Sequence, residues 1–517
     1  MRIRSGVALA LVASLLYAAN LGDYFIGDDF DLVGSFHGKP ASYLVGLLWS
    51  NESGEAWKSW GIDPALGRGY LRPLKIWLLA ADAALWGTHP LGWHLTSTAV
   101  FAAVALLILA ILRRALPGRP ALALAGAFAA VAHPVFSEVV PFITAREELL
   151  SIALGLASFL AFLRHREDGR SPLAVAGWLA LALLAKESSL AFVGLLLGHD
   201  LAHGRLAPGR PLRPLVRVYG PVALVLAAYF ALRWLAFGNF AGGSGEPTWF
   251  FSGRALAYYP RFFGSLGDPT LLSLGGLPGV AWLAAALAAG PVVALAPAWS
   301  RIAPRRRRDL LFYGPLWCLG STALYTGVYF ATRHHVLPVV GLVLFLGVAL
   351  GALLDAGVLA RERRAAAALA AAAGLLFLPP SFTTGLEWRA ASRSVSRLRA
   401  EIERGAADLP DGSRVFVGDV PQLVLPPFYF GWGLLSALRQ PFTPSDLADR
   451  LLVVNPRNLG LTRVRIPLPE RYDRTLQLGG HAAVPLWIRE RYERRLARDL
   501  GLHPGRSADE GSPRRLQ

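Results

Sequence analysis

The sequence predicts an α-helical polytopic membrane protein of about eleven transmembrane helices, followed by a small C-terminal α/β domain. Three observations lead to this prediction. Of the 517 residues, 54% are hydrophobic and only 17% are charged, and the mean hydropathy is +0.42. Apolar runs long enough to cross a bilayer recur as far as residue 380. After Pro380 these runs stop, and charged residues and short alternating stretches take over.

A helix needs about 20 apolar residues to cross the hydrocarbon of a membrane, and about eleven segments approach that length. The two shortest, 171–184 and 187–203, meet at Lys186 and Glu187, which interrupt an otherwise apolar stretch. The predicted spans are residues 6–22, 92–112, 120–137, 146–163, 171–184, 187–203, 215–237, 270–298, 309–330, 336–356 and 365–380.

The first span also has the character of a secretory signal, because Arg2 and Arg4 precede an apolar stretch that ends on small residues. Apolar character continues through Leu21 and Phe25, which favours a helix that is retained. Both interpretations place the acidic residues that follow outside the cytoplasm.

Basic residues predict the orientation of the helices. With the N-terminus in the cytoplasm, every basic cluster falls in a cytoplasmic loop, as the positive-inside rule requires. The agreement holds only if the segment 71–86, which is broken by Lys75 and Asp82, lies along the membrane interface and does not cross. The clusters lie at residues 113–119, 164–170, 205–217, 301–308 and 361–364.

Composition also argues against other classes of protein. The net charge of +17 sits in short clusters between apolar runs and forms no single basic face, so nucleic-acid binding is not expected. The single cysteine, Cys318, lies inside an apolar run, which excludes a disulfide framework within the chain and a cysteine-based metal site. Richness in alanine and arginine predicts a bacterial inner-membrane protein.

The opposite, extracytoplasmic side collects charged residues of both signs near helix ends. Asp28, Asp29 and Asp31 come directly after the first span. Carboxylates at a membrane surface are costly to desolvate and mark sites where a proton or a cation is handled. On the same predicted side lie Arg72, Lys75, His94, His133, Glu138, Arg146, Glu147, Glu148, Lys186, Glu187, Arg333, His334 and His335.

The predicted domains are a membrane domain, an outer domain and a tail. The membrane domain covers residues 1–380 and includes a first outer loop, 23–91, with interfacial helices. Residues 381–504 are predicted to form an extracytoplasmic mixed α/β domain, with an amphipathic helix over 387–404 and strands over 414–420 and 463–468. The polar tail, 505–517, is predicted to be disordered.

A set of short motifs resembles the GT-C superfamily of membrane glycosyltransferases, and most closely its protein O-mannosyltransferase-like branch. The resemblance covers roughly residues 5–380 and rests on the order and shared sidedness of the motifs. No tetratricopeptide period of that branch follows Pro380. The motifs are GDDFD at 27–31, RPL at 72–74, LWG at 85–87, PLGWH at 90–94, HP at 133–134, AKE at 185–187 and RH at 333–334.

The resemblance implies an inverting enzyme that transfers a sugar from a polyprenyl-phosphate carrier to a protein or glycolipid acceptor on the extracytoplasmic face. It implies Asp28 or Asp29 as the base that takes the acceptor proton. Cations that steady the departing phosphate are predicted at Arg72, Lys75, Arg146, Lys186 and Arg333. The other predicted substrate-binding residues are Asp31, His94, His133, Glu138, Glu187 and His334.

Several alternatives stay open at this level. The aspartates could be a solvated helix end, Arg72 and Lys75 could anchor to headgroups, and Lys186 and Glu187 could neutralise each other. No cofactor is certain; a divalent metal held by histidines 94, 133 and 334 with a carboxylate is open, although no metal-binding spacing occurs. The rival functions are a transporter or lipid flippase, and a non-catalytic assembly protein. Charges gathered at one surface and the lack of a repeat favour the enzyme.

Overall fold

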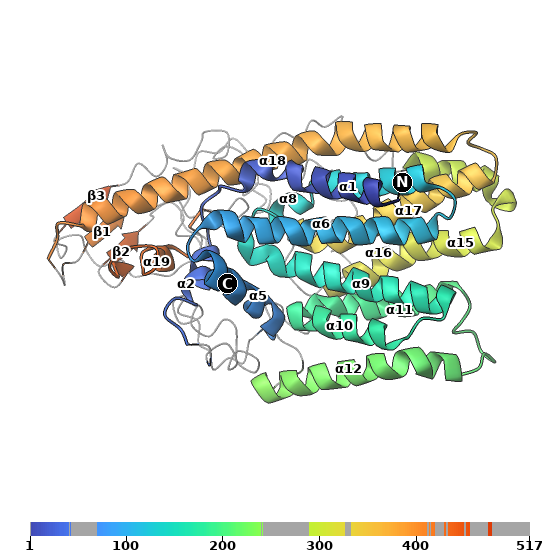
Figure 1. Ribbon diagram of the computed structural model, residues 1–517, viewed down its shortest axis with the longest axis horizontal. Coiled ribbons are helices and arrows are strands. Elements are labelled where there is room, and N and C mark those ends of the chain that lie inside the picture. The colour runs from blue at the N-terminus through green and yellow to red at the C-terminus, as the bar shows by residue number, and fades with distance from the viewer. Residues whose placement is uncertain are drawn as a thin grey trace, which may run out of the picture.

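The computed structural model describes residues 2–40, 42, 70–238, 240, 289–325, 332–410, 413, 415–418, 429–430, 433–448, 451–454 and 474–477. These residues form a helical bundle, along which a long helix, α18, runs and projects beyond one end (Figure 1). Helices α1, α6, α9, α10 and α12 form a row in which each helix contacts the next. Helices α7 and α17 pack beside this row, and α7 also contacts α18.

The helical elements begin and end where the sequence provides local signals. Proline stands in the first turn of α5, α6, α7, α12 and α15, where its fixed φ suits the helix and its missing N–H is not needed. Gly169 and Gly238 end α9 and α12 in the left-handed conformation, which glycine adopts without strain.

Helices of the first half, in chain order, are α1 (Arg2–Leu16), η1 (Ala18–Asn20), α2 (Asp29–Gly34), α5 (Pro73–Trp86), α6 (Pro90–Ala115), α7 (Pro120–Ala132), α8 (Phe136–Val139), η3 (Ile143–Ala145), α9 (Arg146–Asp168), α10 (Leu173–Ala185), η4 (Glu187–Ser189), α11 (Leu190–Ala202) and α12 (Arg213–Phe237). The later helices are η7 (Trp299–Arg301), α15 (Pro304–Leu311), η8 (Phe312–Leu316), α16 (Trp317–Thr322), η9 (Ala323–Tyr325), η10 (Thr332–His335), α17 (Val336–Asp355), α18 (Glu362–Ala406) and α19 (Leu434–Ala437).

Among the described residues, five helices are long and apolar enough to cross a membrane: α6, α12, α18 and the stretches Ile143–Asp168 and Thr332–Asp355. Three shorter apolar helices are Ile3–Leu16, Pro120–Ala132 and Leu173–Ala185. All eight coincide with predicted spans. The chain is therefore a multi-pass membrane protein, as its composition predicts.

Two predicted spans differ from the structure, and a third lies largely outside it. The span 187–203 is a short η4 turn followed by α11, which has 13 residues like α7 and α10 but, unlike them, contains a buried acid, Asp200, and is not among the apolar helices named above. The span 309–330 is divided among α15, a π-helical turn that contains Pro315, α16 and η9. Of the span 270–298, residues 270–288 lie outside the described residues.

The arginine clusters converge on one end of the bundle. There Arg119 and Arg306 both pair with Asp355 at the end of α17, at 2.6 and 3.0 Å. Arg114 at the end of α6 pairs with Glu167 on α9 at 2.6 Å. These ion pairs join loops that are far apart in the sequence and agree with the predicted one-sided placement of the clusters. Which side faces the cytoplasm stays a prediction.

Helix α5 lies at the opposite end of the bundle and is not among the helices long and apolar enough to span (Figure 1). Its two charged residues, Lys75 and Asp82, are buried against the protein. Its outward side exposes Trp77, Leu85 and Trp86. This arrangement fits the predicted interfacial position, because tryptophan favours the boundary between hydrocarbon and water.

Helix α18 continues through the boundary that the sequence placed at residue 380. It runs unbroken for 45 residues with Pro379 and Pro380 inside it, so the predicted amphipathic helix 387–404 and the last span are one helix. Tertiary contacts hold it together past the prolines. The Ser381 hydroxyl donates to the Ala132 carbonyl on α7 at 2.7 Å, and the buried Trp388 stacks on Phe142.

Three short strands follow α18. Strand β1 (Val415–Gly418) lies between β2 (Leu451–Val454) and β3 (Arg474–Gln477) and pairs in parallel with both. The predicted strand 414–420 contains β1, whereas the predicted strand 463–468 and the tail 505–517 lie outside the described residues. A separate extracytoplasmic α/β domain over 381–504 stays a prediction.

A segment of the C-terminal region packs directly on the first outer loop. The Gly27 amide donates to the Tyr429 carbonyl at 2.7 Å, and Phe30 packs against Phe430 and Phe442. Gly433 lies so close that a Cβ there would be 1.9 Å from the Gly27 carbonyl oxygen. The two backbones can approach in this way only because position 433 has no side chain.

We predict that Gly433→Ala loosens the C-terminal segment from the first loop and destabilises the protein by roughly 1–3 kcal/mol, as overpacking does. Thermal unfolding in detergent and limited proteolysis of the C-terminal segment would measure the effect. Gly177→Ala is the matched control, because a Cβ at this position in α10 meets no atom within 4 Å. Equal behaviour of the two variants would contradict the close packing described here.

Candidate functional site

The acidic loop is held in place by a turn and a short helix. The chain turns at Gly27, whose φ of +51° is in the left-handed region that glycine tolerates. Asp28 follows as the residue that precedes α2, and Asp29 begins that helix. The three aspartates therefore point in different directions and meet different surroundings.

Asp29 is buried and fully engaged. One carboxylate oxygen accepts hydrogen bonds from the Thr144 amide at 2.8 Å and from the Thr144 hydroxyl at 2.7 Å. The other accepts a longer bond of 3.4 Å from the Ile26 amide. With 1% of its surface exposed, Asp29 fastens the first loop to the η3 turn. This geometry makes it a positioning residue.

Asp31 binds the C-terminal segment. Its carboxylate accepts a hydrogen bond from the Ser436 hydroxyl on α19. Burial raises the pKa values of both Asp29 and Asp31 to about 7, although these hydrogen bonds act in the opposite direction. The structure thus gives Asp31 a role in packing, and places it against α19.

Asp28 differs from its neighbours. Its side chain is partly exposed and makes no hydrogen bond to another described residue. Burial raises its pKa to about 6, the cations Arg333 and Lys75 oppose that shift, and Glu147 adds to it. A carboxylate with this pKa is largely ionised at neutral pH and can still accept a proton. Asp28 is thus the one aspartate of the three whose carboxylate accepts no hydrogen bond from a described residue.

An ion network lies next to Asp28, centred on Glu147 at the start of α9. Arg72 donates to Glu147 at 2.7 Å and to Glu187 at 2.9 Å. Lys75, one turn along α5, pairs with the other oxygen of Glu147. Arg72 and Lys75 therefore share a helix face, as their spacing predicts, but both are turned into the protein.

Lys186 joins the same network from the end of α10. It pairs with Glu148, whose second oxygen accepts a hydrogen bond of 2.8 Å from Tyr325. The ring of Tyr325 in turn stacks on His334 at 4.5 Å. Lys186 and Glu187 thus form their ion pairs with different residues, Glu148 and Arg72, and do not pair only with each other.

Arg333 approaches from the η10 turn. It pairs with Glu138 on α8 at 2.6 Å, and its side chain is 16% exposed. Its charge also acts on Asp28. Of the predicted phosphate-binding cations, Arg333 is the most exposed, since Arg72, Lys75, Arg146 and Lys186 are each below 10%.

Arg146 is not available for a phosphate, which corrects the sequence-based assignment. Its guanidinium pairs with Asp82 and donates to the Ser97 hydroxyl at 3.0 Å and to the Trp93 carbonyl. Only 1% of the side chain is exposed. Because every nitrogen has a partner on α5 or α6, Arg146 holds α9 to those two helices.

His94 and His133 are also structural where substrate contacts were predicted. His94 bonds through Nε2 to the Asp23 carbonyl at 3.0 Å, and His133 Nδ1 accepts from the Val135 amide at 3.1 Å. Both side chains are buried. Within the residues that the structure describes, no group of three or more metal-binding side chains comes together. The metal site suggested for His94, His133 and His334 does not assemble there.

Two residues of the site were missed by the sequence analysis. In the sequence, Asp82 stands out only as a break in an apolar stretch, although a lone acid in such a stretch is typical of a buried ion pair. Thr144 carries no local signal at all, because its role depends on the approach of Asp29 from a distant part of the chain.

The predicted site residues therefore separate into two groups. Arg72, Lys75, Glu138, Lys186, Glu187, Arg333 and His334 gather in or beside the network that faces Asp28. Asp29, Asp31, His94, His133 and Arg146 hold the surrounding elements in place. In the network described, four cations meet the carboxylates Glu138, Glu147, Glu148 and Glu187, so its charges balance.

Comparison with known proteins supports the sequence resemblance. The chain is 28% identical over 198 residues to "Protein O-mannosyl-transferase TMTC3" of Mus musculus, which is 36% of this chain and 20% of that protein. It is 31% identical over 185 residues to "Protein O-mannosyl-transferase Tmtc1" of Drosophila melanogaster, which is 35% of this chain and 20% of that protein. The resemblance to the O-mannosyltransferase branch is confirmed over these stretches. The chain spans about a fifth of the length of either relative.

Two solved structures and the known families complete the comparison. ArnT from Cupriavidus metallidurans in the apo state is 14% identical, with a TM-score of 0.43 over 82% of this chain and 83% of that one. The same protein bound to undecaprenyl phosphate gives a TM-score of 0.37 over 82% and 84%. No protein-family model matches the chain.

We predict that Asp82→Asn destabilises the protein by about 3–5 kcal/mol, because it leaves the buried Arg146 without its counter-charge. Thermal unfolding in detergent measures the loss. Glu167→Gln is the matched control, since Arg114 is more exposed and keeps Asp168, and a change of about 0.5 kcal/mol or less is expected. An Asp82→Asn protein with normal stability but lost donor binding would restore Arg146 to the phosphate-binding set.

Proposed function

We propose that the chain is an integral membrane glycosyltransferase that transfers a sugar from a polyprenyl-phosphate carrier to a protein or glycolipid acceptor, at the membrane surface where α2 and α5 lie. The proposed mechanism is a single inverting displacement at the anomeric carbon. Asp28 is the base that takes the acceptor proton, and no covalent intermediate is needed.

The observation that carries the proposal is the environment of Asp28. Its carboxylate has no hydrogen-bond partner among the described residues, whereas Asp29 and Asp31 are bonded to Thr144 and Ser436. Its pKa of about 6 is close to the operating range of a general base. An acceptor hydroxyl that reached Asp28 would meet a carboxylate that is ionised and free to bond.

The proposed donor phosphate lies near Lys75 and Arg333, the two cations whose charges act on Asp28. Arg333 has a planar guanidinium that can hold two phosphate oxygens, and it is the most exposed cation of the set. A phosphate there would replace the Glu138 carboxylate as its partner. As the sugar leaves, the negative charge that develops on the phosphate would be stabilised by these cations.

The transporter or flippase alternative is less well supported. Transport sites typically place charged residues near the middle of the membrane. Here the network draws on α5, η4, α8, η10 and the first turn of α9. Figure 1 shows α5 and the start of α9 at the same end of the bundle as α2, and η4 contacts α9 while η10 contacts α8. A scaffold function would not need the unbonded Asp28, so substitution there separates the enzyme from both rivals.

We predict that Asp28→Asn lowers the single-turnover rate of transfer by about 10² to 10⁴, the usual cost of removing a general base. The assay follows a labelled polyprenyl-phosphate sugar with purified full-length protein and a membrane extract as acceptor source. Insertion and stability should stay normal, because Asp28 bonds to none of the described side chains, and donor binding should be retained.

Asp29→Asn is the matched control for this test. Its predicted signature is lower thermal stability with a smaller loss of rate, because its carboxylate accepts two bonds from Thr144. Near-normal transfer by the Asp28→Asn protein would remove this residue from the mechanism.

The rate of transfer should also depend on pH through Asp28. Because burial raises the pKa of this carboxyl from its ordinary 3.8 to about 6, the protein loses its base as the pH falls through 6. We predict that kcat/KM is halved near pH 6 and falls about tenfold per unit below it. A profile that stays flat down to pH 4 would contradict a buried base, and the residual rate of Asp28→Asn should lack this limb.

A further inference from the structure

One face of α18 changes from apolar to basic along its length. The apolar part exposes Leu375, Phe382 and Leu386, with exposed fractions of 78%, 54% and 40%. From Leu375 to the last arginine, successive residues of this series are three, four or seven positions apart. Residues at these spacings lie on the same face of a helix, so the apolar side chains and the arginines share one face. We call the arginines at 389, 393 and 397 the arginine ladder.

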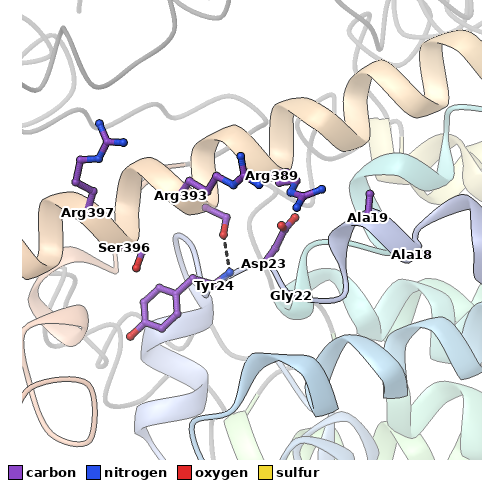
Figure 2. A pocket seen from close by; sticks show the side chains of 10 residues that line it. Ala18, Ala19, Gly22, Asp23, Tyr24, Arg389, Arg393, Ser396 and Arg397 are labelled. Carbon is purple, nitrogen blue, oxygen red and sulfur yellow. Dashed lines mark hydrogen bonds between the residues drawn. The ribbon is translucent and has the colours of Figure 1, made fainter.

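The arginine ladder lines a cavity of about 600 Å³ between α18 and the turn after α1 (Figure 2). Ser392 and Ser396 contribute hydroxyls from the helix, and Asp23 and Tyr24 face them from the turn. Figure 2 shows the Asp23 carboxylate directed toward Arg389. The described lining of the cavity therefore combines several hydrogen-bond donors with a single acid.

Among the described residues that line this cavity, three arginines face a single carboxylate, so positive charge is in excess. None of the three arginines forms an ion pair with another residue that the structure describes. Asp23, the one carboxylate that lines the cavity, is 6% exposed and already accepts a 2.7 Å bond from Asn20.

A second basic cavity shows the contrast. It has a volume of about 700 Å³ and lies at the other end of the bundle, where Arg114 and Arg166 line it. Those arginines pair with Glu167 and Asp200. Two arginines of that cavity are thus paired with carboxylates, whereas no member of the arginine ladder forms such a pair with a described residue.

We propose that the arginine ladder binds the phosphate of a membrane lipid, whose acyl chains lie along Leu375, Phe382 and Leu386. Guanidinium groups hold phosphate oxygens two at a time, and serine hydroxyls can donate to the rest. A free phosphate would bind the arginines but would leave the apolar part of this helix face exposed. A lipid matches both halves of the same helix face.

The proposed lipid site is distinct from the donor site, but both involve the first outer loop. The Tyr24 amide donates to the Ser392 hydroxyl, and Asn20 bridges Asp23 and the Gly385 carbonyl. The turn that forms the floor of the cavity continues directly to Asp28. The inference does not rest on the proposed transferase function, because it concerns binding alone.

The test is equilibrium binding of fluorescent phosphatidic acid to the full-length protein in neutral detergent. The variant R393Q/R397Q removes the two exposed members of the arginine ladder. We expect its dissociation constant to rise about thirtyfold, the loss that two surface arginines facing an anionic lipid account for. A photoreactive analogue should crosslink to residues 386–397 or to the turn 18–24.

The matched control is R363Q/R364Q, which makes the same charge change at exposed positions of the other end of α18 and should leave the affinity unchanged. Diacylglycerol with the same acyl chains should bind much more weakly. If the double variant unfolds, Arg397→Gln alone should raise the dissociation constant about fivefold.

Several outcomes would overturn the proposal. Equal affinity in R393Q/R397Q, equal binding of diacylglycerol, or crosslinks confined to other helices would each do so. Full displacement of the lipid by inorganic phosphate at equal concentration would assign the cavity to a soluble anion and not to a lipid.

Discussion

A buried charge requires a counter-charge, and this requirement organises the end of the bundle that carries the candidate site. Glu147 and Glu148, in the first turn of α9, gather Arg72 and Lys75 from α5 and Lys186 from the end of α10. Removing any member would leave an uncompensated charge in a medium of low dielectric, at a cost of several kcal/mol. The ion pairs therefore fix α5 and the α10–η4 junction against α9, and so define the wall that Asp28 faces.

The balance of charges has a chemical consequence. Because each cation of the network already has a carboxylate partner, the proposed donor phosphate would have to exchange with a carboxylate and would not fill an empty site. Replacing the carboxylate by a phosphate would disturb the network least at the Arg333–Glu138 pair, because Arg333 is partly exposed. Arg333 and Lys75 lower the pKa of Asp28, which burial alone would raise further. In the proposed function, donor binding and the ionisation of Asp28 would therefore be coupled through the charges of these cations.

Helix α18 joins the apolar region before residue 380 to the more charged region after it. Its first half packs on α7 inside the bundle, and its second half holds the turn before Asp28 through Gly385 and Ser392. The segment around Tyr429 and Gly433 then contacts Gly27 from the other side. The first outer loop is therefore held between the bundle, α18 and the C-terminal region. The arginine ladder places a second charged surface on the same helix, near the membrane boundary that its apolar half marks.

The sequence by itself determined the membrane class, the positions of most helices and the gathering of the arginine clusters at one end of the bundle. These are local properties, because the length and polarity of a segment decide whether it can enter a bilayer. Only the tertiary structure decided which of the three aspartates has no hydrogen bond to a described residue, that Lys186 pairs with Glu148 and not with its neighbour Glu187, and that Arg146 is enclosed by Asp82 and Trp93. It also decided that α18 continues past Pro380. Each of these outcomes depends on partners distant in the chain, and a short sequence pattern carries no information about which distant side chain will neutralise a buried charge.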